Sequence, residues 1–189
     1  MNEVTAPRGY ARILERSQAI GFGMNSDVLT GSLLRTLVAS KPGGRMLELG
    51  TGCGTGTCWM ADGMDATASL TSVDTDGTTQ SIAREELGAD PRVNFVLEDG
   101  SAFLAGVATP YDLIYADAWP GKYSDLERAL DLVAPGGIYL VDDMLPQRNW
   151  PDGHDVKAAA LRRRLSSLAG FQVTTLDWST GLIICVRTT

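Results

Sequence analysis

Short apolar runs and helix-like segments alternate along most of the chain. Runs that fit buried β-strands fall at residues 45–49, 69–73, 93–97, 111–116 and 137–142. Segments with helical spacing of apolar residues lie between and after them, at 57–64, 77–88, 101–105, 123–133 and 154–169. Strands that alternate with helices predict a parallel sheet with right-handed crossovers. Such sheets bind ligands at the carboxyl ends of their strands, so the residues after each run are candidate site residues.

The two ends of the chain follow other patterns. Residues 9–20 and 27–40 predict two helices, the second capped by Ser26 or Asp27. Residues 170–176 and 182–187 predict two strands joined by a turn, which makes the last pair of strands antiparallel. Because no repeat or linker divides the chain, we expect one α/β domain over residues 1–189, with a helical cap segment at 1–40. Its sheet should be Rossmann-like, doubly wound, mostly parallel and seven-stranded.

Composition bears on whether the protein binds nucleic acid or a membrane and on where in the cell it is expected. The formal charge of −7 argues against a general nucleic-acid surface. No apolar stretch is long enough to span a bilayer, and the first residues lack the apolar core of a signal peptide. The three cysteines form no CxxC motif. We therefore expect a cytoplasmic protein with reduced cysteines and no membrane partner.

A glycine-rich turn is the strongest chemical signal. The apolar run that contains Glu48 ends in glycines at 50, 52, 54 and 56. Such a turn lets the backbone approach a ligand, but the spacing misses the G-x-G-x-x-G fingerprint of dinucleotide sites. A Glu48 carboxylate would repel a pyrophosphate and attract a cation. S-adenosylmethionine (SAM) carries an ammonium and a sulfonium, and Asp74 closes the next run, where a carboxylate can accept the ribose hydroxyls.

Together these segments resemble the class I SAM-dependent methyltransferases, and most of all the catechol-type, cation-dependent O-methyltransferases. Leu47-Glu-Leu-Gly-Thr-Gly-Cys-Gly54 matches the first motif of that family and Val73-Asp74 its ribose-binding acid. Glu98-Asp-Gly-Ser-Ala102 resembles the turn beside the adenine, with Ser101 where an aspartate is common, and Met24-Asn25 matches a segment that closes over the cofactor. The resemblance implies the class I methyltransferase fold and a cofactor-binding set of Met24, Asn25, Glu48, Gly50, Thr51, Gly52, Asp74, Thr75, Asp99, Gly100, Ser101, Asp117 and Trp119.

A second set of acids follows the runs 111–116 and 137–142. The resembling family binds Mg²⁺ with an aspartate from the first place and an Asp-Asn pair from the second. Asp117 and Asp142 match, and Asp143 stands where asparagine is usual. Three carboxylates at neighbouring strand ends suit a hard divalent cation. The resemblance implies a metal site of Asp117, Asp142 and Asp143, and catalytic roles for Asp117 and Lys122.

The chain departs from the family pattern at Pro120, where a general-base lysine is usual. Lys122 lies two residues further on, so it reaches the substrate only from a rearranged loop. Trp119 is expected to wall the acceptor pocket, with Trp150 and His154, the single histidine, as weaker candidates for a wall and a base. The resemblance also allows a homodimer.

Three interpretations stay open. The first is SAM-dependent O-methylation of a small hydroxylated acceptor, aromatic or polar, with or without a divalent cation. The second is a methyltransferase-like protein that binds SAM without catechol-type chemistry. The third, an NAD-dependent oxidoreductase, is disfavoured by the glycine spacing and by Glu48.

Overall fold

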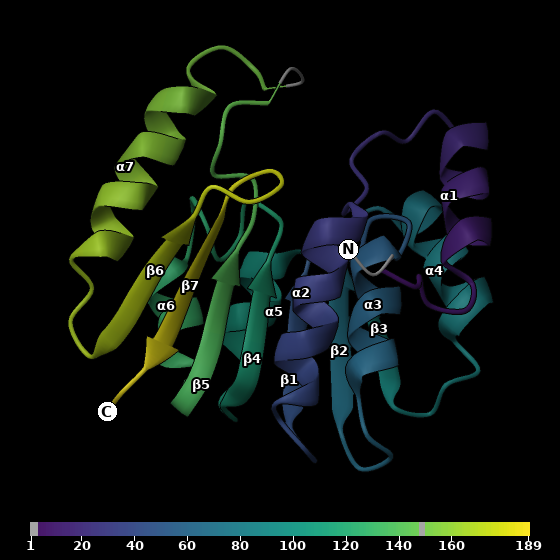
Figure 1. Ribbon diagram of the computed structural model, residues 1–189, viewed down its shortest axis with the longest axis horizontal. Helices are drawn as coiled ribbons and strands as arrows, with labels where there is room; N and C mark the ends of the chain where they lie inside the picture. Colours follow the sequence, from purple (N-terminus) through teal and green to yellow (C-terminus); the bar gives the residue numbers. More distant parts are fainter. Residues whose placement is uncertain (1–3, 148–149) are drawn as a thin grey trace.

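A seven-stranded sheet crosses the computed structural model, which describes residues 4–147 and 150–189 (Figure 1). The strand order is β3-β2-β1-β4-β5-β7-β6. The first five strands in the chain pair in parallel, and β7 runs antiparallel to both β5 and β6. The predicted sheet and its C-terminal hairpin are confirmed. The strands are β1 Arg45–Leu49, β2 Ser69–Asp74, β3 Val93–Leu97, β4 Tyr111–Ala116, β5 Val133–Val141, β6 Phe171–Leu176 and β7 Leu182–Arg187.

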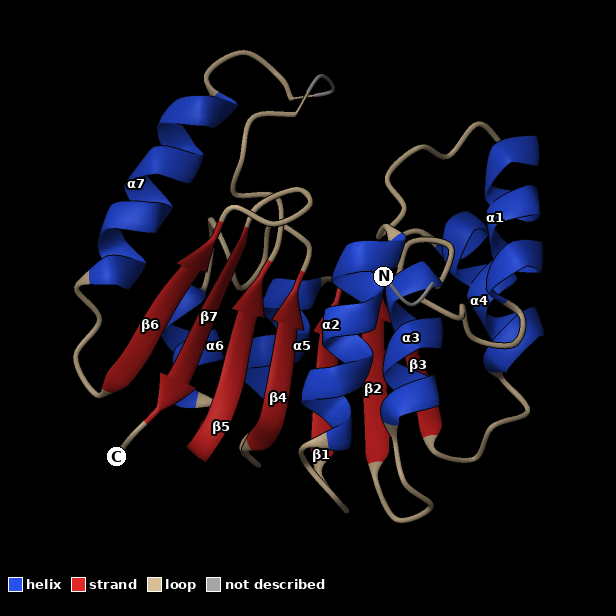
Figure 2. Cartoon of the chain, viewed as in Figure 1, coloured by secondary structure: helices blue, strands red, loops and turns tan. Residues whose placement is uncertain are grey.

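Helices cover the two faces of this sheet (Figure 2). On one face lie α2 Val28–Ala39, α3 Thr55–Gly63 and α4 Gly77–Leu87, and α1 Tyr10–Ala19 packs against α3 and α4. The other face packs against α5 Gly100–Gly106, α6 Leu126–Asp131 and α7 His154–Ser166. Asp27 caps α2, because its side chain accepts hydrogen bonds from the backbone N–H groups of Leu29 and Thr30.

Several element boundaries differ from the sequence prediction, among them those of α3, α6 and β5. Helix α3 begins at Thr55 rather than residue 57, because Gly54 adopts a left-handed φ of 96° and ends the turn there. Helix α6 begins only at Leu126, since Asp125 also has a positive φ, 54°, and interrupts the expected segment 123–133. Strand β5 is longer than expected and begins at Val133.

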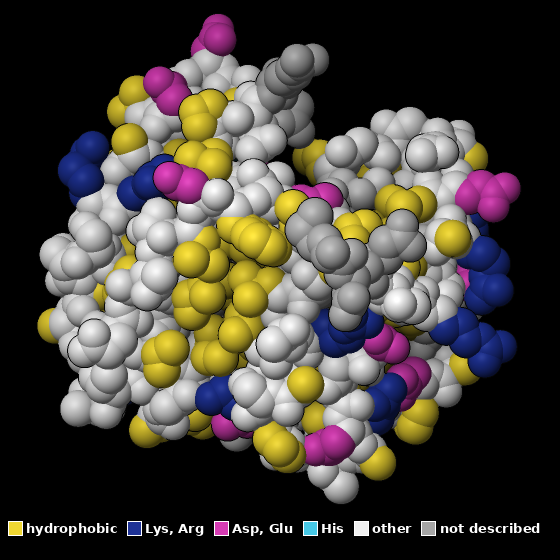
Figure 3. Space-filling view, in the orientation of Figure 1, with side chains coloured by type: hydrophobic (Ala, Val, Ile, Leu, Met, Phe, Trp, Pro, Cys, Tyr) yellow, Lys and Arg dark blue, Asp and Glu magenta, His cyan; other side chains and the backbone are white. Residues whose placement is uncertain are grey.

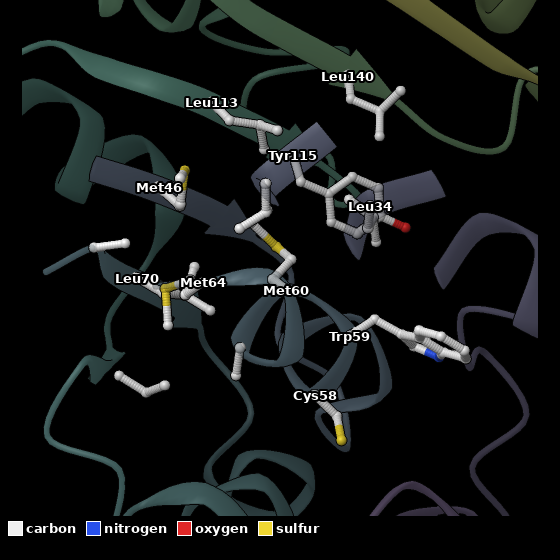
Figure 4. Close-up of a cluster of buried hydrophobic side chains, with 14 of the residues drawn as sticks. Leu34, Met46, Cys58, Trp59, Met60, Met64, Leu70, Leu113, Tyr115 and Leu140 are labelled. Atoms are coloured by element: carbon white, nitrogen blue, oxygen red, sulfur yellow. The ribbon is translucent and has the colours of Figure 1, made fainter. Parts of the chain in front are cut away.

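The core on the first face centres on α3 (Figure 4). Trp59 and Met60 are fully buried there and belong to the same cluster as Met46 of β1 and Tyr115 of β4. Helix α2 crosses α3 closely, because a Cβ atom added at Gly31 would lie 2.3 Å from the Trp59 ring. The glycine is therefore required by packing, and the two helices fix the position of the glycine turn that precedes α3.

The half of the sheet away from these helices carries exposed apolar surface. Figure 3 shows apolar side chains gathered over β5 and β7, beside α2. Ile184, Val186 and Leu176 are partly buried apolar residues of β7 and β6 on this face. Among residues 4–147 and 150–189, no helix combines the length and the apolarity that a bilayer crossing needs.

Candidate active site

A cavity of about 630 Å³ lies at the carboxyl ends of β1, β2, β4 and β5. Because the strands are parallel, their ends meet at one edge, and residues far apart in the chain converge there. Almost every residue expected from the sequence lines this cavity, namely Met24, Asn25, Gly50, Thr51, Gly52, Asp74, Thr75, Asp99, Gly100, Asp117, Trp119, Lys122, Asp142 and Asp143. Glu48 and Ser101 do not line it.

The glycine turn and Asp74 form one wall. Gly50 and Gly52 have φ values of 101° and 52°, which glycine adopts without strain. A Cβ atom on Gly50 would lie 2.6 Å from the backbone oxygen of Asp117, so no larger residue fits there. The Gly52 N–H donates to Asp74 Oδ2 at 2.8 Å. The turn thus holds a carboxylate at the cavity edge, with the start of α3 beside it.

Glu48 does not line the cavity, and its expected contact with the cofactor stays a prediction. In the pairing of β1 with β2, Glu48 lies beside Ser72, which is two residues before Asp74. The Glu48 side chain contacts Thr57 in the first turns of α3. Its Oε2 accepts hydrogen bonds of 2.5 Å from Thr57 Oγ1 and from Ser72 Oγ. The residue is fully buried, and this burial raises the pKa of its carboxyl from 4.5 to about 7.

The turn after β3 provides Asp99 and Gly100 but not Ser101. Asp99 caps α5 by accepting hydrogen bonds from the backbone N–H groups of Ser101 and Ala102, at 3.0 and 3.1 Å. This capping starts the helix at Gly100 and carries Ser101 into its first turn, away from the cavity. Of the expected pair, Asp99 lines the cavity and Ser101, two positions later, does not.

The loop after β4 brings Lys122 into the cavity. Backbone N–H groups of Lys122, Tyr123 and Ser124 all donate to the Trp119 carbonyl, at 3.1, 2.8 and 3.2 Å. Gly121 adopts a φ of 87° and its carbonyl accepts a hydrogen bond from the Tyr139 hydroxyl, which pins the turn to the sheet. As a result the Lys122 side chain is only 5% exposed and lines the cavity.

The three expected metal-ligating carboxylates lie in the cavity, but Asp142 is already engaged. Its Oδ2 accepts a 2.6 Å hydrogen bond from the Tyr115 hydroxyl. Its Oδ1 accepts from the backbone N–H of Asp143 at 2.6 Å and from the Thr180 hydroxyl. Within the described ranges, no group of three or more Asp, Glu, His or Cys side chains is arranged to hold a metal ion. The predicted metal site therefore gains no support from this geometry.

Burial raises the pKa of two further acids of the cavity, Asp117 and Asp143. Burial and the nearby Asp142 carboxylate raise the pKa of Asp117 well above its ordinary value, and the Lys122 ammonium opposes that shift. The same two causes raise the pKa of Asp143, again against the effect of Lys122. The charge of Lys122 therefore acts on both Asp117 and Asp143 and lowers the pKa of each.

An aromatic cluster forms the opposite wall, and the sequence only partly indicated it. The His154 ring lies 4.5 Å from the Trp150 ring and 6.0 Å from the Trp119 ring, centroid to centroid. The Tyr123 hydroxyl lies 3.1 Å from His154 Nε2. Burial and the charges of Lys122 and Lys157 lower the pKa of His154, which favours the neutral imidazole. The cluster joins rings from the loop after β4 to rings at and before the start of α7, a contact that no local pattern predicts.

Comparisons with known proteins give a consistent picture. The sequence profile of a methyltransferase domain family matches residues 47–144. A relative from Mycolicibacterium smegmatis, described as a candidate O-methyltransferase, is 32% identical over 184 residues, which cover 92% of this chain and 87% of the relative. A similarly described protein from Mycolicibacterium vanbaalenii is 31% identical, but the alignment spans 58% of its length and 67% of this chain.

Solved structures share the fold. An O-methyltransferase from Bacillus cereus, in complex with S-adenosylhomocysteine (SAH), has a TM-score of 0.81 at 20% identity and covers 97% of this chain and 92% of its own. The O-methyltransferase TomG from Streptomyces achromogenes, in complex with SAM, has a TM-score of 0.83 at 18% identity and covers 98% and 92%. At these identities the likeness establishes the shared fold.

Proposed function

Since this chain belongs to the methyltransferase domain family, we propose that it transfers the methyl group of SAM to an oxygen of a small hydroxylated acceptor. The observation that carries the proposal is the single cavity in which the glycine turn, Asp74 and an aromatic cluster face the same space. Its volume of about 630 Å³ falls within the usual range for small-molecule sites.

The first half of the cavity suits the cofactor. In this proposal Asp74 accepts the ribose hydroxyls, which agrees with its position beside the glycine turn. The turn formed by Asp99 and Gly100 lies beside the adenine, and the segment of Met24 and Asn25 closes over the bound molecule. Glu48 does not line the cavity and supports the start of α3 through its hydrogen bond with Thr57.

The second half suits a flat acceptor. Trp119 is 50% exposed and lines the cavity together with Trp150 and His154, so aromatic side chains are available to contact a flat acceptor. In the reaction the acceptor oxygen forms a bond to the methyl carbon while the bond from that carbon to sulfur breaks. SAH leaves as a neutral thioether, and the acceptor hydroxyl loses its proton to water. The chain contributes mainly by holding donor and acceptor in line.

The alternative of a SAM-binding protein without catechol-type chemistry is favoured by one observation. Pro120 occupies the position of the usual general-base lysine, and the rearranged loop bridges Pro120 to Ser124. A panel of phenols and catechols with methyl-labelled SAM separates the two functions. We expect labelled product from at least one acceptor, whereas a panel with no product and normal SAM binding would favour the binding protein.

Cofactor binding is tested first by isothermal titration of the protein with SAM, SAH and NADH. We expect SAM and SAH to bind and NADH to give no heat. Asp74→Asn is the matched variant, because it removes the charge and leaves the size of the side chain unchanged. The absence of binding at millimolar SAM would overturn the proposed function, and binding of NADH alone would point to an oxidoreductase.

A homodimer remains part of the proposal, as a prediction. The apolar surface over β5 and β7 (Figure 3) is where we would expect a second copy to dock, since exposed apolar patches commonly mark interfaces. Sedimentation equilibrium measures the mass in solution, and a monomer at micromolar concentration would refute the dimer.

A further inference from the structure

One of the three carboxylates that the family resemblance assigns to a divalent cation, Asp142, is already hydrogen-bonded on both oxygens. A magnesium or manganese ion needs oxygen lone pairs directed at it from several ligands. Asp142 receives hydrogen bonds on both oxygens, from the Tyr115 hydroxyl on one and from the Thr180 hydroxyl and the Asp143 N–H on the other. Asp142 is only 3% exposed, so a metal ion would have to compete with these buried hydrogen bonds for the lone pairs of its carboxylate.

These partners belong to a network that ties distant parts of the chain together. Tyr115 also lies 3.3 Å from the Ser26 hydroxyl, and Ser26 donates its backbone N–H to Thr55 Oγ1 at 3.0 Å. The network thus joins the segment before α2, the start of α3 and the ends of β4 and β5. Asp142 therefore acts as the acceptor that holds these elements together.

A positive charge already occupies the neighbourhood of these acids. The turn after β4 directs Lys122 inward, and its side chain is 5% exposed. Its Nζ lies 5.6 Å from the Tyr123 ring centroid, and Lys122 lines the same cavity as Asp117 and Asp143. Lys122 is the one Lys or Arg side chain among the described residues of the lining, which otherwise carries seven aspartates: Asp27, Asp74, Asp76, Asp99, Asp117, Asp142 and Asp143.

We infer that the Lys122 ammonium stands in for the divalent cation, so that this chain needs no metal ion and offers the lysine as the positive partner of the acceptor oxygen. The role of Lys122 toward the acceptor oxygen rests on the proposed function. The absence of metal binding can be tested without knowing the acceptor. A doubly charged ion placed beside the ammonium would be repelled at short range, which adds to the loss of ligands from Asp142.

The test measures metal binding directly, without turnover. Bound Mn²⁺ is quantified by electron paramagnetic resonance, with and without SAH, in the wild type, in Lys122→Met and in the control Lys41→Met, which removes a lysine outside the cavity. We expect no bound Mn²⁺ in the wild type or the control at millimolar metal. We expect Lys122→Met to bind Mn²⁺ at least tenfold more tightly, because the repulsion is gone.

Circular dichroism and SAH titration establish that each variant is folded, and Lys122→Gln replaces Lys122→Met if the apolar side chain prevents folding. Mn²⁺ bound to the wild type at micromolar concentration would overturn the inference, as would lysine variants that bind Mn²⁺ no better than the wild type. In either case normal SAH binding would leave the proposed function intact. A wild type that binds neither SAH nor SAM would overturn the proposed function alone.

Once an acceptor is known, a chelator provides a second measurement. We expect methyl transfer in the presence of EDTA to equal that without it, and we expect Lys122→Met to raise the KM for the acceptor while the affinity for SAH stays within twofold. Loss of transfer in EDTA that added Mg²⁺ restores would overturn the inference.

Discussion

Glu48→Gln tests the electrostatics beneath the glycine turn. Glu48 is fully buried, Oε2 accepts hydrogen bonds from Thr57 and Ser72, and Oε1 is buried without a partner among the described residues. Burial raises the pKa of this carboxyl from 4.5 to about 7 in the folded protein. Glutamine keeps the shape and an acceptor for the two hydroxyls but cannot ionise.

The sign of the effect follows from the number of bound protons. Between pH 4.5 and about 7 the folded protein keeps the proton that the unfolded chain has released at Glu48. The free energy of unfolding therefore falls as the pH rises through this window, and the contribution of Glu48 is complete only below pH 4.5. A shift of about 2.5 pKa units at ~1.36 kcal/mol per unit amounts to about 3 kcal/mol.

The assay is guanidinium unfolding of the wild type and Glu48→Gln, followed by tryptophan fluorescence across this pH window. We expect the free energy of unfolding of Glu48→Gln, relative to the wild type, to increase by about 3 kcal/mol from acid to neutral pH. The contributions of all other titrating groups cancel in this difference, because both proteins contain the same groups. Glu127→Gln, at an exposed glutamate, is the control and should show a flat difference. A flat difference for Glu48→Gln would refute a buried carboxyl with a raised pKa.

Three further predictions concern the cofactor wall and the helix packing. Asp74→Asn should raise the Kd for SAM at least about tenfold in a calorimetric titration, since hydrogen bonds to a charged group contribute ~1.5–3 kcal/mol, and an unchanged Kd would remove Asp74 from the site. Asp27→Ala should lower the free energy of unfolding by about 1 kcal/mol through loss of the α2 cap, and a change near zero would contradict that role. Gly31→Ala should destabilise by roughly 1–3 kcal/mol because its Cβ meets the Trp59 ring, whereas Gly106→Ala, which meets nothing within 4 Å, should be nearly neutral.

The fold could be predicted from the sequence because local signals and tertiary structure agree for most elements. The β1 strand occupies residues 45–49 as expected, since its apolar run is bounded by glycines on both sides. The hairpin of β6 and β7 also forms as expected. The misplaced starts of α3 and α6 depend on left-handed backbone conformations at Gly54 and Asp125, which residue type allows but does not require.

The site was predictable in position and less so in detail. The residues that follow parallel strands must meet at one edge, so Asp74, Asp99 and Asp117 could be placed together from the chain order alone. The sequence placed Glu48 at the same edge, but it did not give the register of β1 and β2, which sets Glu48 beside Ser72. A difference of two residues along β2, from Ser72 to Asp74, thus separates the buried level of Glu48 from the level of the cavity wall.

The sequence by itself determined the order of strands and helices, the glycine turn and the edge of the sheet at which the acids gather, because these depend on short-range patterns of apolar and flexible residues. Only the tertiary structure decided that Lys122 turns inward, that Asp142 is occupied by Tyr115 and Thr180, and that His154 joins an aromatic wall. Those contacts join residues from different strands and loops. Their geometry is set by register, loop direction and packing, which no single stretch of the chain encodes.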